Sequence, residues 1–185
     1  MIDQVNRQAV TTHSMTQVAN SDFSIIEIKD RYLWSIQANR EHSLSVITQT
    51  LFHETAQFGS MLTTDSLRLI QLWPHKAYLL AAQPSLPGGL QEFTSMVTDI
   101  SHGFCELSFV GDQAFELLNS HTSADLKHAQ VARTCNLRCL LGQYQIILWW
   151  DLVYDIHILI DRSYAQSFCD YLEQLRRRWS QAAIC

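Results

Sequence analysis

The sequence predicts an α+β fold of two related lobes, each an antiparallel sheet with packed helices. Apolar residues alternate with polar ones in two series of short strands, and segments with helical apolar spacing occur in each half. The 185 residues are 47% hydrophobic and 17% charged, which excludes collagen-like and wholly disordered chains and suffices for a core without disulfide or metal. We expect a polar N-terminal arm over residues 1–22 and a single domain over residues 23–185, with lobes at about 23–100 and 101–180.

The first lobe is predicted to begin with a hairpin and a helix. Residues 23–29 and 31–37 have the pattern of strands, and the turn-capable pair Lys29-Asp30 between them favours a hairpin. Apolar residues then recur at helical spacing from Ser43, which suits a helix N-cap, towards Gly59.

A second hairpin and helix are expected to complete this lobe. Residues 67–72 and 77–82 are predicted strands, and Pro74 between them fixes φ in a way that suits a turn. Residues 87–89, Pro-Gly-Gly, should then open a helix. The apolar side of that helix would carry Leu90, Phe93, Met96 and Val97.

The second lobe is predicted to contain four strands and a short helix. In residues 104–110, Cys105, Leu107 and Phe109 alternate with Glu106 and Ser108, the pattern of a strand with one buried face. A short helix is expected over residues 112–119. Three further strands, over 134–141, 144–150 and 153–160, have tight connections and should pair antiparallel.

The last predicted element is a helix with a clear apolar stripe. Ser163 and Gln166 have the spacing of a capping box, which places the helix N-terminus here. The stripe consists of Tyr164, Phe168, Leu172, Leu175 and Trp179. The basic run over residues 176–178 lies where this helix should end, where cations interact favourably with the helix dipole.

The charge and hydropathy of the chain limit which partners and locations are expected. The formal net charge is −5, so we expect no nucleic-acid partner. The start of the chain lacks a signal-peptide pattern, and the most apolar stretch, residues 144–160, is interrupted by charged and polar residues, so neither export nor membrane insertion is expected. A cytoplasmic location with five reduced cysteines follows from these expectations.

The chain shows few of the patterns that carry chemistry. Cys135 and Cys139 lack the spacing of a zinc knuckle, the histidines lack the pairing of a helical metal site, and no phosphate-binding loop or Gly-x-Ser-x-Gly elbow occurs. Asp155 and His157 share one strand face about 7 Å apart and could form a base with its orienting acid. We expect a solvated or interface pair instead, and we assign no catalytic, cofactor-binding or metal residue.

Adjacent tryptophans raise the question of what covers the sheet of the second lobe. Trp149 and Trp150 point to opposite faces of a strand that is apolar on nearly both sides. Either another protein covers one face, or helices of this chain cover both. The arm over residues 1–22 is consistent with a segment that folds on a partner, and equally with an idle tail.

Several stretches occur in an order that resembles the sarcosine oxidase gamma subunit family. The likeness extends over about residues 24–178 and rests on motifs at strand ends and helix starts. Two motifs differ, since the family's Gly-Pro corresponds to Gly111-Asp112 and its Asp-Glu to His75-Lys76. The stretches that carry the resemblance are 72–80 (LWPHKAYLL), 102–118 (HGFCELSFVGDQAFELL), 123–126 (SADL), Thr134 and 161–165 (DRSYA).

This resemblance implies a non-catalytic small subunit in a heterotetrameric flavin-dependent sarcosine oxidase or a related secondary-amine oxidoreductase. The fold would be similar to that of the folate-binding aminomethyltransferases. The chain itself would hold no cofactor, whereas the alpha, beta and delta subunits would hold FAD, FMN, NAD, zinc and tetrahydrofolate. The alternative is a stand-alone folate-binding or aminomethyltransferase-like protein.

Overall fold

A computed structural model describes residues 24–29, 31–38, 44–55, 59–86, 90, 94–111, 113–127, 136–152 and 155–182. The predicted arm over residues 1–22 lies outside these ranges. Within them the chain forms two five-stranded sheets in which every pairing is antiparallel. The expected α+β class is therefore confirmed.

Sheet A has the strand order β1-β7-β10-β9-β8, and sheet B has the order β3-β4-β5-β2-β6. Sheet A consists of β1 (Ser24–Ile28), β7 (Phe104–Val110), β8 (Asn136–Leu141), β9 (Tyr144–Leu152) and β10 (Asp155–Asp161). Sheet B consists of β2 (Tyr32–Ala38), β3 (Met61–Thr63), β4 (Leu67–Trp73), β5 (Lys76–Ala81) and β6 (Thr94–Asp99). The helices are α1 (Leu44–Phe52), α3 (Ala114–His121) and α5 (Ala165–Ala182), with single 3-10 turns η1 (Ser101–Gly103) and η2 (Arg162–Tyr164).

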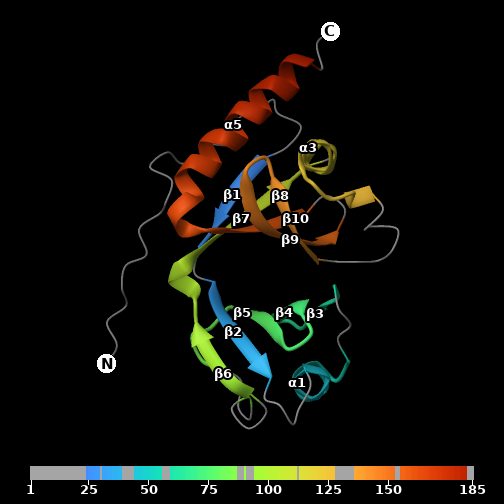
Figure 1. Ribbon diagram of the computed structural model, residues 1–185, viewed down its shortest axis with the longest axis vertical. Helices are drawn as coiled ribbons and strands as arrows, with labels where there is room; N and C mark the ends of the chain where they lie inside the picture. Colours follow the sequence, from blue (N-terminus) through green and yellow to red (C-terminus); the bar gives the residue numbers. More distant parts are fainter. Residues whose placement is uncertain are drawn as a thin grey trace.

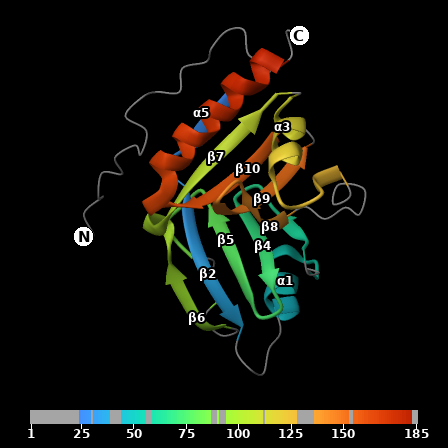
Figure 2. The ribbon, with the colours of Figure 1, turned by 45° about the horizontal axis from the view of Figure 1, so that its top comes forward.

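The two sheets pack face to face between helices. Helices α3 and α5 lie on the outer side of sheet A, and α1 lies on the outer side of sheet B (Figures 1 and 2). One apolar cluster joins the inner faces, to which sheet B contributes Leu33, Ile70, Leu72, Tyr78 and Leu80 and sheet A contributes Ile147, Trp149 and Leu159. Trp149 is fully buried in this inner cluster, whereas Trp150 belongs to the outer cluster, which includes residues of α3 and α5. Elements of this chain therefore cover both tryptophans.

Several predicted elements are confirmed with small shifts of their ends. Helix α1 lies in the predicted helical segment, although the predicted cap Ser43 lies outside the described residues. Strands β4 and β5 form the predicted hairpin about Pro74, and α3 occupies the place of the expected short helix. Strands β8, β9 and β10 pair antiparallel as expected. The three-residue strand β3 was not predicted because so short a segment has no recognisable period.

The predicted hairpin of residues 23–37 is wrong. Strand β1 pairs with β7 at the edge of sheet A, whereas β2 pairs with β5 and β6 inside sheet B. The chain crosses between the sheets near Lys29 rather than reversing there. An alternating pattern predicts a strand and its buried face, but it does not identify the strand's neighbours.

The predicted helix after residue 89 is confirmed only at Leu90, which is helical, and is wrong for residues 94–99. Residues 87–89 and 91–93 lie outside the described residues, but Met96 and Val97 belong to β6, an edge strand of sheet B. Thr94, Val97 and Thr98 have β-branched side chains, which fit a pleated strand better than a helix. Pairing with β2 therefore decides the conformation of this segment.

The start of α5 differs from the predicted capping box. The Asp161 carboxylate accepts hydrogen bonds from the backbone N–H and hydroxyl of Ser163, while the Gln166 amide donates to Asp170. The Asp161 carboxylate therefore caps the preceding 3-10 turn, in place of the predicted capping-box hydrogen bonds between Ser163 and Gln166. The predicted stripe otherwise packs on sheet A, except that Tyr164 is 57% exposed.

The basic run does not end the helix. Helix α5 continues to Ala182, and the guanidinium groups of Arg176 and Arg177 both bind the Glu173 carboxylate, at 2.8 and 3.0 Å. These contacts lower the pKa of Glu173, with the Arg176 hydrogen bond as the main cause. Arg176 and Arg177 therefore form ion pairs with a carboxylate one helical turn away, and they do not lie at the helix C-terminus as predicted.

Gly142 in the turn between β8 and β9 should tolerate no side chain. Its φ is 59°, and a Cβ there would lie 2.5 Å from the Tyr171 hydroxyl oxygen on α5. We expect Gly142→Ala to lower the free energy of unfolding by about 1–3 kcal/mol, measured by urea denaturation. Gly103→Ala is the matched control because a Cβ there meets no atom within 4 Å, so its effect should stay within about 0.5 kcal/mol. Equal losses for both variants would contradict this explanation.

Candidate functional site

A cluster of charged side chains is buried between the sheets. In β7, Leu107 and Phe109 face the helices, so Glu106 and Ser108 face sheet B. The prediction of one buried face for this strand is wrong, because Glu106 is only 5% and Ser108 only 4% exposed. His157 on β10 lies opposite Ser108 and is equally buried.

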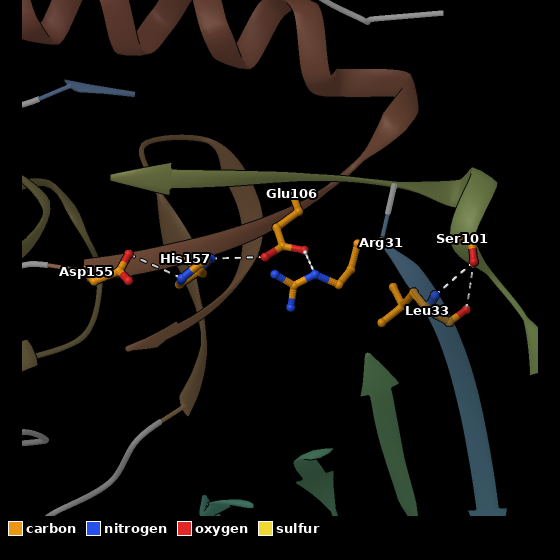
Figure 3. Close-up of polar contacts among 6 residues, drawn as sticks. All are labelled: Arg31, Leu33, Ser101, Glu106, Asp155 and His157. Carbon is orange, nitrogen blue, oxygen red and sulfur yellow. Dashed lines mark hydrogen bonds and ion pairs between the residues drawn. The ribbon is translucent and has the colours of Figure 1, made fainter. Parts of the chain in front are cut away.

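His157 is held on both sides by carboxylates (Figure 3). Its Nδ1 lies 3.0 Å from Glu106 Oε1, and its Nε2 lies 3.3 Å from Asp155 Oδ1. The contact with Glu106 is a hydrogen bond that Nδ1 donates, because a carboxylate only accepts, whereas the contact with Asp155 has only the distance of an ion pair. The ring also stacks on Trp149, with centroids 5.2 Å apart and planes inclined by 8°.

Arg31 extends the cluster to the segment that links the sheets. Its Nε lies 3.7 Å from Glu106 Oε2, a separation of opposite charges too long for a hydrogen bond. The cluster thus joins two carboxylates to the Arg31 guanidinium and the His157 imidazole. Figure 3 shows the four side chains in one row, Asp155, His157, Glu106 and Arg31.

This geometry favours a structural role over acid–base catalysis. A general base needs a free ring nitrogen within reach of a substrate, but both nitrogens of His157 face carboxylates. The cavity beside Glu106 and Arg31 has a volume of only about 30 Å³, which is room for about one water molecule. The expectation that Asp155 and His157 form a solvated or interface pair is wrong for His157, whose side chain is 8% exposed, whereas that of Asp155 is 42% exposed.

Hydrogen bonds fasten the two segments that cross between the sheets. Ser101 Oγ accepts from the backbone N–H of Leu33 at 2.8 Å (Figure 3). The backbone N–H of Ile100 also donates to Leu33 O, at 2.9 Å. Arg162 donates to the carbonyl oxygens of His102 and Phe104, at 2.9 and 2.7 Å. The crossing near residue 30 and the crossing near residue 102 are thereby held side by side, next to the buried charges.

A larger open groove lies where the inner face of β9 emerges beyond the hairpin of β4 and β5. It has a volume of about 790 Å³. Two cations lie over its rings, because the Arg138 guanidinium is 5.4 Å from the Trp73 ring centroid and Lys76 Nζ is 5.5 Å from the same centroid. Burial raises the pKa of the Tyr78 hydroxyl, and Arg138 partly offsets this effect. Prominent lining residues are Trp73, Tyr78, Phe104, Arg138, Tyr144 and Tyr164.

The described cysteines are buried thiols without a metal-binding environment. Burial raises the pKa of Cys105 to about 12, an effect to which Glu27 adds, and it raises those of Cys139 and Cys169 to about 11. A thiol whose pKa is higher in the folded state favours unfolding as pH rises past its unfolded value. Among the described residues no group of three or more His, Cys, Asp and Glu side chains could hold a metal ion. Cys135, the predicted neighbour of Cys139, lies outside these residues.

Sequence reasoning paired Asp155 with His157 but did not find Glu106, Arg31 or the groove. Glu106 and His157 become neighbours only through the register of β7 against β10, which the alternating pattern does not specify. One indication of the buried cluster was present in the sequence, because Glu106 and Ser108 occupy alternate positions of the otherwise apolar strand β7.

The buried charges generate a stability prediction. Glu106→Ala would leave His157 and Arg31 without their shared carboxylate in a buried site, so the free energy of unfolding should fall by about 3–5 kcal/mol in urea denaturation. Asp155→Ala is the control, because that carboxylate is 42% exposed and its loss should cost below about 1 kcal/mol. Similar losses in the two variants would show that the buried position of Glu106 does not matter.

Comparisons with known proteins support the fold. The chain matches no protein-family model and no curated protein sequence. In the described part of the chain, no helix is long and apolar enough to cross a membrane. A chain from the solved structure of heterotetrameric sarcosine oxidase from Corynebacterium sp. U-96, in complex with pyrrole 2-carboxylate, is similar with a TM-score of 0.73 and 18% sequence identity. The similarity covers 85% of this chain and 85% of that chain, so the two share a fold along most of their lengths.

Proposed function

We propose that this chain is a non-catalytic, gamma-like subunit of a heterotetrameric flavin-dependent sarcosine oxidase or a related secondary-amine oxidoreductase. Its role would be to assemble and stabilise that complex in the cytoplasm. The observation that carries the proposal is the fold similarity over 85% of both chains to one chain of such an oxidase. Because the two covered shares are equal, the matching chain is of similar length and is itself small.

The buried cluster supports a role without chemistry of its own. Both nitrogens of His157 are engaged, and the adjacent cavity admits about one water molecule. We propose that FAD, FMN, NAD, zinc and tetrahydrofolate belong to the alpha, beta and delta partner subunits. The contribution of this chain would then be buried surface, of the order of 800 Å² per partner in a stable interface.

Exposed apolar side chains at sheet edges provide candidate contact surface. Strands β1 and β6 are edge strands in the described sheets, and unpaired strand edges favour association. Ile26 on β1 is 43% exposed, and Met96 on β6 is 56% exposed. Both side chains are therefore exposed enough to contact a partner subunit.

The second candidate is a stand-alone folate-binding or aminomethyltransferase-like protein. The observation in its favour is the groove of about 790 Å³, which falls within the range of small-molecule sites. Its aromatic lining and Arg138 would suit a flat anionic ligand.

Co-expression distinguishes the two candidates. The full chain should purify without flavin absorbance or sarcosine turnover, and it should elute with alpha, beta and delta subunits as one flavin-containing complex in size-exclusion chromatography. Omission of this chain should lower the thermal stability of the remaining complex, because its buried interface is lost. Flavin binding or amine turnover by the isolated chain would refute the proposal, and micromolar binding of tetrahydrofolate in calorimetry would favour the second candidate.

A further inference from the structure

We propose that the groove lined by Trp73, Tyr78, Arg138 and Tyr164 binds an acidic segment with aromatic side chains from a partner subunit. This inference rests on the proposed function, because it assigns the surface through which the subunit is recognised. Three observations support it: the shape of the groove, its exposed apolar rim and the charge of its cations.

The groove lies at the end of the contact between the two sheets. On the inner face of β9, Ile147 belongs to the buried inner cluster, whereas Gln145, two residues earlier, is exposed, and both line the groove. The groove therefore begins where the core ends, and Tyr144 and Phe104 line it as well. An open channel along a strand accommodates an extended segment better than a compact ligand.

The rim of the groove exposes large apolar side chains. Tyr164 is 57% exposed, although it begins the stripe of a helix that is otherwise packed on sheet A. Leu140 is 45% exposed and lies on the same face of β8 as Arg138, opposite the lining residue Gln145. Aromatic rings and an arginine at such a site are typical of the residues that dominate protein interfaces.

The side chains at the groove include two cations, although the chain as a whole has a negative net charge. The chain has a net charge of −5, yet no carboxylate among the described residues forms an ion pair with Lys76 or Arg138. Arg138 donates to the neutral Gln145 amide oxygen at 2.6 Å, which leaves its charge uncompensated.

The lining carboxylate of Asp161 keeps its negative charge, because its partner Ser163 is neutral. Lys76 is not itself a lining residue, but its ammonium lies over the lining rings of Trp73 and Tyr78, at 5.5 and 5.9 Å from their centroids. Two cations therefore oppose one carboxylate at the groove, and this excess of positive charge favours an acidic occupant.

Binding of an acidic aromatic polymer to the isolated full chain tests this chemistry without any partner. The probe is a random copolymer of Glu and Tyr, compared with a copolymer of Lys and Tyr, in calorimetry at low and physiological salt. We expect the Glu copolymer to bind, with affinity that falls as salt rises, and Arg138→Glu to weaken it about ten-fold or more.

Lys127→Glu is the matched control for this charge reversal. Lys127 is 58% exposed, pairs with Glu116 on α3 and lies outside the set of groove-lining residues, so its reversal should leave polymer binding unchanged. Urea denaturation of both variants checks that they are folded. Equal weakening by the two variants, no binding by the wild type, or preference for the Lys copolymer would overturn the proposal. Displacement of the polymer by tetrahydrofolate would assign the groove to a small ligand instead and would also overturn it.

A photocrosslinking residue in place of Tyr164 tests the groove inside the complex. In the assembled complex it should crosslink to a partner segment rich in Asp and Glu. If the complex forms and position 164 crosslinks to no partner, or to a basic segment, the groove proposal is refuted while the proposed function stands. If no complex forms, the proposed function fails, and the polymer experiment still decides the chemistry of the groove.

Discussion

The contact between the inner faces of the two sheets organises the rest of this structure. Trp149 lies in that contact, fully buried, with Ile147 beside it on β9 and Leu80 across from it on sheet B. Each sheet has helices on its outer side, so the central strands are buried on both faces. Burial of apolar area on this scale contributes about 25 cal/mol per Å², and the sheets separate only if that contribution is lost.

The inter-sheet contact also determines where polar groups can lie. Because β7 and β10 are covered on both faces, any polar residue on the inner face must find a partner within the protein. Glu106 Oε1 and His157 Nδ1 do so by pairing with each other, whereas Glu106 Oε2 has no hydrogen bond and only the 3.7 Å ion pair with Arg31. The cluster reaches one of the crossing segments through Arg31, which lies between β1 and β2 and pairs with Glu106.

Beyond the inter-sheet contact, the same geometry leaves a surface for other molecules. Sheet B covers only part of the inner face of sheet A, and the remaining part forms the groove with Arg138 and Tyr164. This uncovered part is the surface on which the proposed recognition of a partner subunit would take place.

The alternating patterns predicted where most strands lie because burial on one face acts locally on the sequence. They failed for the pairing of β1, because nothing in residues 24–28 distinguishes β2 from β7 as a neighbour. They failed for β6, where a helical spacing of Met96 and Val97 was overridden by pairing with β2. The site was predictable only for Asp155 and His157, which are two residues apart, whereas Glu106 and Arg31 join them through the tertiary fold.

Native-state hydrogen exchange tests most directly whether the inter-sheet contact makes both sheets one cooperative unit. Backbone amides in the centres of β5 and β9 should exchange with the same free energy of opening, equal to that of global unfolding, because neither sheet retains its inner face without the other. If the amides of sheet B open at a free energy several kcal/mol below those of sheet A, the sheets fold independently and the contact does not have the role assigned to it.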